Sequence, residues 1–88
     1  MNDLLSEADA HAIQEILIRE LEVKPDQLTA EARFDQDFAT DSLVRVEILM
    51  AIEDRFDLSI PEERSERVQT VGQLYELVAE MLQVRRRG

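Results

Sequence analysis

A serine beside a carboxylate, in Thr40-Asp41-Ser42-Leu43, is the place where this 88-residue sequence has the residue types for chemistry. A serine hydroxyl can act as a nucleophile, cap a helix or carry a covalently attached group. A serine hydrolase would need a glycine-flanked turn after a strand, together with a histidine base. The only histidine, His11, lies in a different segment. We therefore expect Ser42 not to be catalytic, and His11 to be solvated or lightly packed.

The acidic stretch from Asp35 to Asp41 suggests a calcium-binding loop. An EF-hand loop would need a third ligand, a glycine and a glutamate at the positions that Ala39, Thr40 and Val46 occupy. All three requirements fail. The sequence therefore predicts no dedicated metal site.

Composition limits the partners of this chain. Twenty acidic residues against ten basic ones give a formal net charge of −10, which argues against nucleic acid and anionic membranes. The same charge favours basic protein partners, although acidic surfaces also keep small proteins dissolved. There is no cysteine, no run long enough to span a membrane and no secretory signal pattern. We expect a cytoplasmic monomer.

Apolar residues at helical spacing predict an all-α fold, a small bundle of three main helices and one short helix. The helices are expected over residues 7–22, 42–56, 62–67 and 71–82. Ser6, Asp41 and Thr70 suit helix caps, and Pro61 suits the first turn of the short helix. We expect a single domain over residues 1–88, ordered from about residue 6 to 83, with a basic tail over 84–88.

Residues 23–40 form a long connection in which three apolar residues, Leu28, Phe34 and Phe38, supply anchors. A connection of this length needs its own packing or a function in a compact domain. Gly72 is unusual, because it falls in the first turn of the last helix.

The helix expected after Ser42 has two different faces when its residues are placed at about 100° each. One face is apolar enough to pack a core: Ile48, Leu49, Ile52 and Phe56. The other face mixes apolar residues with acids: Leu43, Val46, Glu47, Met50, Asp54 and Asp57. Exposed apolar patches rimmed by charge are typical of protein contact sites.

Along nearly the whole chain, the sequence resembles the acyl carrier protein family. The matching residues are Asp41-Ser42-Leu43, Val46-Glu47, Met50-Ala51, Glu53, Phe56, Ile60-Pro61 and Thr70-Val71. The resemblance implies that 4′-phosphopantetheine, taken from coenzyme A, is attached to Ser42, and that its thiol carries an acyl group as a thioester. It also implies that Asp41 helps a phosphopantetheinyl transferase to recognise Ser42, and that the fold itself is not an enzyme.

The resemblance further implies acyl-loading and acyl-transfer enzymes of fatty-acid or lipid synthesis as partners, with basic docking patches. The residues that match the docking helix are Leu43, Val46, Glu47, Met50, Glu53 and Asp54. Two alternatives stay open. One is a polyketide, aminoacyl or peptidyl carrier, although such carriers tend to be less acidic and part of longer chains. The other is an unmodified helical adaptor in which Ser42 is only a cap.

Two departures from the family pattern carry expectations. Ala39-Thr40 stands where the family often has glycine, so we expect this turn to avoid glycine-only backbone geometry. Arg45 falls toward the packed side of its helix. Either its stem lies on the surface with its head in water, or it gates an apolar crevice or meets a polar or hydroxylated acyl group there. The expected boundary of that crevice is Phe34, Leu49, Ile52, Phe56, Ile60, Val68 and Leu74.

Overall fold

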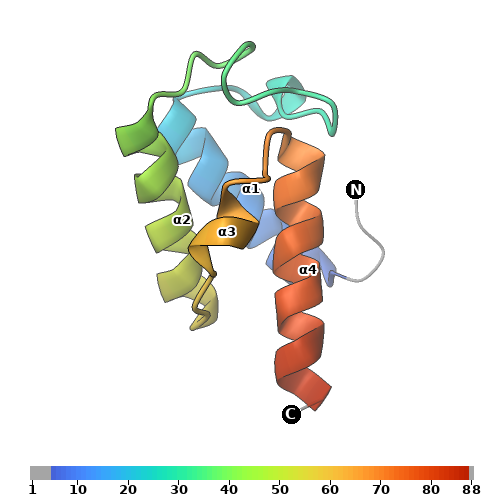
Figure 1. Ribbon diagram of the computed structural model, residues 1–88. Helices are drawn as coiled ribbons and strands as arrows, with labels where there is room; N and C mark the ends of the chain where they lie inside the picture. The colour runs from blue at the N-terminus through green and yellow to red at the C-terminus, as the bar shows by residue number, and fades with distance from the viewer. Residues whose placement is uncertain (1–4, 88) are drawn as a thin grey trace.

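The computed structural model describes residues 5–87, and within them it confirms the predicted all-α bundle of three main helices and one short one. The elements are α1 (Glu7–Leu21), a 3-10 helix η1 (Pro25–Gln27), α2 (Ser42–Phe56), α3 (Glu62–Ser65) and α4 (Val71–Arg87). The short α3 lies between α2 and α4, and the long connection crosses one end of the bundle (Figure 1). No described helix is long and apolar enough to cross a membrane.

Helix α1 begins as predicted after Ser6, whose hydroxyl accepts a hydrogen bond from the Asp9 N–H at 3.1 Å. The helix ends at Leu21, one residue before the predicted end. Glu22 takes the left-handed conformation, with φ at 56°, and its N–H donates to the Ile18 carbonyl at 2.9 Å. A left-handed residue at this position is a common way to end a helix.

The connection after α1 is anchored as the sequence predicts. Leu28 and Phe34 are buried, Phe38 is partly buried, and the Phe34 and Phe38 ring centroids are 6.3 Å apart. The short helix η1 was not predicted, and it begins at Pro25. Proline fits this position because its fixed φ suits a first helical residue and its missing N–H would have no helical partner.

Gly72 lets the connection approach α4 closely. Its N–H donates to the Ala30 carbonyl at 2.9 Å, and the neighbouring Val71 N–H donates to the Ala32 carbonyl at 3.0 Å. A Cβ atom at position 72 would lie 3.0 Å from the Ala30 oxygen. Glycine therefore stands in the first turn of α4 because any side chain would push the connection away.

The short helix α3 ends at Ser65, two residues before the predicted end, and Pro61 is its cap rather than part of its first turn. The chain leaves the helix there because Val68 is buried in the core, and the Val68 N–H donates to the Ser65 carbonyl at 3.1 Å. Burial of this side chain outweighs continuation of a short polar helix.

Helix α4 corrects the expectation of a basic tail after residue 83, because it continues to Arg87. Arg85 donates to the carbonyls of Phe56 and Asp57, both at 2.6 Å, and pairs with the Asp57 carboxylate at 3.1 Å. These contacts hold the last turns of α4 against the C-terminal end of α2. Residue 88, the end of the expected tail, lies outside the described residues.

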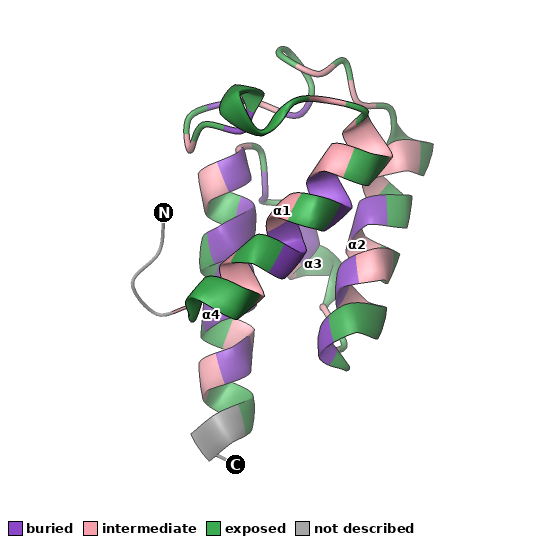
Figure 2. Cartoon of the chain, turned by 180° about the vertical axis from the view of Figure 1, so that it is seen from behind, coloured by how far each residue is buried: buried purple, intermediate pink, exposed green. Residues whose placement is uncertain are grey.

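The core is mainly aliphatic and is built largely from the inner faces of α1, α2 and α4 (Figure 2). Its most completely buried side chains are Ile13, Leu17, Ile52, Val71, Leu74 and Val78. From α2, Ile48 and Phe56 are also buried and Leu49 is partly buried, so the predicted core face of this helix is confirmed. The opposite face of α2 is left at the surface.

Candidate functional site

Ser42 is the first residue of α2, and its side chain is exposed. The N-cap is Asp41, whose carboxylate accepts a hydrogen bond from the Val44 N–H at 2.9 Å. The Asp41 carbonyl also accepts from the Arg45 N–H at 3.1 Å. Within the described residues the Ser42 hydroxyl has no hydrogen-bond partner. Capping therefore does not explain this serine.

The start of α2 fits a covalently attached phosphate. The first N–H groups of a helix have no partner inside the helix, and the helix dipole favours negative charge at this end. The N–H groups of Ser42 and Leu43 are in this position, since Asp41 serves only the Val44 N–H and the Arg45 N–H. The exposed Ser42 hydroxyl leaves room for a long group on its solvent side.

The turn before Ser42 does not have the predicted backbone. We expected Ala39-Thr40 to avoid the geometry that glycine favours, yet Ala39 lies in the left-handed region with φ at 50°. The expectation was wrong because a contact with an earlier part of the connection fixes the turn. The Thr40 N–H donates a hydrogen bond to the Phe34 carbonyl at 2.9 Å. Such a conformation costs a residue with a Cβ roughly 1–2 kcal/mol.

The exposed side of α2 is called the acidic–apolar face below. It consists of Leu43, Val46, Glu47, Met50 and Asp54. Its apolar members are unusually exposed for their type, at 65% for Leu43, 49% for Val46 and 57% for Met50. Large apolar side chains left in water beside acids indicate a contact surface.

Glu53 differs from the other residues expected on this face. Its side chain is half-buried, and its carboxylate accepts a hydrogen bond from the Ile60 N–H at 2.7 Å. Glu53 therefore holds the loop after α2 in the free protein and is less available to a partner than Glu47 or Asp54, which are exposed.

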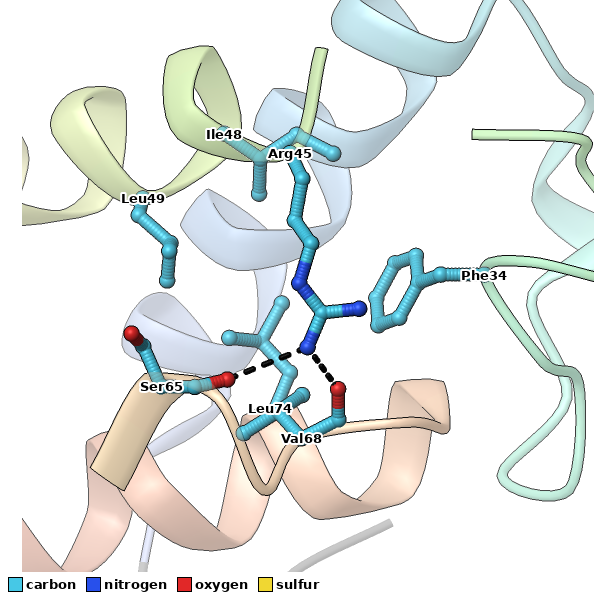
Figure 3. A pocket seen from close by; sticks show the side chains of 7 residues that line it. All are labelled: Phe34, Arg45, Ile48, Leu49, Ser65, Val68 and Leu74. Carbon is cyan, nitrogen blue, oxygen red and sulfur yellow. Dashed lines mark hydrogen bonds between the residues drawn. The ribbon is translucent and has the colours of Figure 1, made fainter. Parts of the chain in front are cut away.

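A small apolar pocket lies between α2, α3, the connection and α4 (Figure 3). Its lining residues are Phe34, Arg45, Ile48, Leu49, Ser65, Val68 and Leu74. Four of these were predicted to bound a crevice, whereas Ile52, Phe56 and Ile60 pack elsewhere in the core or at its edge. Ile48 and Ser65 were not predicted to line it. The contribution of Ser65 includes a backbone carbonyl, which leaves no signal in a sequence.

Arg45 reaches across this pocket, so its predicted position on the packed side is correct. Its Nη2 atom donates to the Ser65 carbonyl at 3.0 Å and to the Val68 carbonyl. The interpretation that placed its head in water is wrong for Nη2, because its two acceptors are backbone carbonyls at the end of α3 and in the segment that follows it (Figure 3).

No group of three or more potential metal ligands is assembled anywhere in residues 5–87. His11 is exposed and pairs with Glu15, one turn along α1, at 2.8 Å. Neither feature contributes to the site at Ser42.

The chain is similar to known proteins along most of its length. A family model described as "Phosphopantetheine attachment site" matches residues 11–78. The chain is 39% identical over 70 residues to an acyl carrier protein of Phenylobacterium zucineum, which covers 80% of this chain and 89% of that protein. It is 36% identical over 80 residues to an acyl carrier protein of Caulobacter vibrioides, which covers 91% of this chain and 96% of that protein.

Proposed function

Because the chain belongs to the acyl carrier protein family, whose non-catalytic members bear covalent 4′-phosphopantetheine, we propose that Ser42 is its attachment residue. The terminal thiol of that group holds an acyl chain as a thioester. The protein then delivers acyl groups to enzymes of fatty-acid or lipid synthesis.

The state of the Ser42 hydroxyl carries this proposal. It is exposed at the start of α2 and unengaged by any described residue, while the neighbouring Asp41 provides the cap. An adaptor that used this serine only as a cap would need the hydroxyl to accept a backbone N–H. The arrangement instead supports modification of the hydroxyl by a phosphopantetheinyl transferase.

The acidic–apolar face supports delivery to partner enzymes. It starts beside Ser42 at Leu43 and continues along α2 to Asp54. Charge complementarity speeds the encounter with a basic patch, and a small interface permits fast release. Both properties suit a protein that visits several enzymes in succession.

The attachment is tested by incubating the purified protein with coenzyme A and a promiscuous phosphopantetheinyl transferase, and then measuring its intact mass. Wild type should gain one phosphopantetheine, and Ser42→Ala should gain none. Ser59→Ala is the matched control, because Ser59 is also exposed but lies after α2, and it should gain the group normally. An unchanged wild-type mass, or a mass gain that survives Ser42→Ala, would refute the proposal.

A further inference from the structure

The pocket beneath Arg45 is too small for an acyl chain in the free protein. Its volume is about 10 Å³, which is about the least that holds one water molecule. An acyl chain can enter only if α2 moves away from the segment between α3 and α4. The inference below rests on the proposed function, and it concerns what Arg45 does when a chain enters.

Arg45 is a direct tie across the gap that must open. Its Nη2 atom contacts carbonyls 20 and 23 residues further along the chain, at Ser65 and Val68. Arginine has five N–H donors. The Nε and Nη1 atoms of Arg45 have no protein acceptor among the described residues, and because they are not among the buried unpartnered atoms, they face solvent in the free protein. The guanidinium lies beside the Phe34 ring and above the Leu74 side chain (Figure 3). A partly buried cation with spare donors therefore borders an apolar path.

The free-energy cost of entering this pocket differs between saturated acyl chains and acyl chains that carry an oxygen. A saturated chain has no acceptor, so its entry either breaks the bonds of Arg45 or places hydrocarbon against unpaired charged donors. Both outcomes are unfavourable, since buried polar groups without partners are costly. A chain with a hydroxyl or oxo group can accept from Nε or Nη1 and avoid this cost.

The position of Arg45 determines where along the chain that group must lie. Ser42 and Arg45 are three residues apart, so they are neighbours on the surface of α2 near its first turn. The methyl end of an acyl chain is its most apolar part and is favoured in the deepest part of the pocket. The carbons close to the thioester then remain near the mouth, where Arg45 lies.

We propose that Arg45 is a specificity-determining residue that favours acyl chains with a hydroxyl or oxo group on the carbon β to the thioester over saturated chains of the same length. The tie to Ser65 and Val68 keeps the pocket closed to saturated chains. The two unpaired donors recognise the β-oxygen.

The test compares thermal unfolding of the phosphopantetheinylated protein loaded with decanoyl or with 3-hydroxydecanoyl groups, after intact mass has verified each loading. In wild type, the hydroxyacyl form should unfold about 4 °C above the decanoyl form, a shift expected for a difference near 1 kcal/mol in a domain of this size. In Arg45→Met, which keeps the apolar stem and removes the donors, the difference should vanish or reverse.

Arg55→Met is the matched control, because Arg55 is on the same helix but contacts the Phe56 ring outside the pocket. It should keep the wild-type difference. Equal midpoints for the two loaded wild-type forms would overturn the inference, even if Arg45→Met failed to fold. A protein that accepts no phosphopantetheine would instead refute the proposed function, so the two failures are distinguishable by mass.

Discussion

Asp41 and Ser42 are both residue types that cap helices, and the structure gives the cap to Asp41. Its carboxylate receives the Val44 N–H at 2.9 Å, while the Ser42 hydroxyl faces solvent without a described partner. The sequence predicted Asp41 as the cap, but it could not exclude a second cap bond from Ser42. That distinction depends on the side-chain torsion of each residue, which a sequence pattern does not specify.

Asp41→Asn separates the charge of this residue from its capping role. Asparagine caps helices about as well as aspartate, so the unfolding midpoint in urea should stay close to that of wild type. The rate of modification by the transferase should fall about tenfold if the carboxylate contributes a charge-assisted contact worth about 1.4 kcal/mol. Asp41→Ala, in contrast, should also lose about 1 kcal/mol of stability. An unchanged modification rate in Asp41→Asn would show that the transferase does not read this charge.

At the scale of the element, α2 has one face in the core and the other in water. Its residues, bounds and two faces were predicted well, because helical periodicity and capping are local properties of the sequence. The role of Glu53 was not predictable in the same way. Its bond to the Ile60 N–H depends on how the chain turns back after α2, which is not a local property.

Glu47→Gln tests whether the acidic–apolar face docks on basic partners. With the transferase as partner, the second-order rate constant at low salt should fall roughly threefold, since one steering charge is lost. The decline of the rate with added salt should also become shallower than in wild type. Glu76→Gln is the matched control, because Glu76 is an exposed glutamate on α4. Equal losses in both variants would indicate a general charge effect and contradict docking through this face.

Met50→Ala examines the apolar part of the same face. Met50 is 57% exposed, so its removal should change the urea midpoint little, within about 0.5 kcal/mol. Apparent affinity for the transferase should nevertheless fall several-fold if the side chain is buried at the interface. An unaltered KM of the transferase for this variant would show that Met50 is not part of the interface.

At the scale of the whole molecule, ties between distant segments hold the bundle together, and these were the least predictable features. Arg45 and Arg85 donate to backbone carbonyls 20 to 29 residues away, and Gly72 allows α4 to approach Ala30. Carbonyls are present in every residue, so nothing in the sequence marks the ones that are used. The left-handed Ala39 has the same origin, since its turn is fixed by a contact with Phe34.

Arg85→Met tests whether the end of α4 is part of the fold rather than a tail. The variant keeps the apolar stem and removes bonds to Phe56 and Asp57, so unfolding should become easier by about 1 kcal/mol in urea titrations. The loss is small because the Arg85 side chain is 49% exposed and its ion pair is screened by water. Val84→Ala, at a site 68% exposed, should have almost no effect. Equal stability of Arg85→Met and wild type would show that the Arg85 contacts with Phe56 and Asp57 do not hold the end of α4 in the fold.

In the proposed function, an acyl group is bound as a thioester to the phosphopantetheine arm attached to Ser42. The most direct measurement is fragment mass spectrometry of the acylated protein before and after treatment with neutral hydroxylamine, which cleaves thioesters. We expect the arm and the acyl mass on the fragment that contains Ser42, and we expect hydroxylamine to remove the acyl mass and leave the arm. An acyl group on another residue, or one that resists hydroxylamine, would contradict this account.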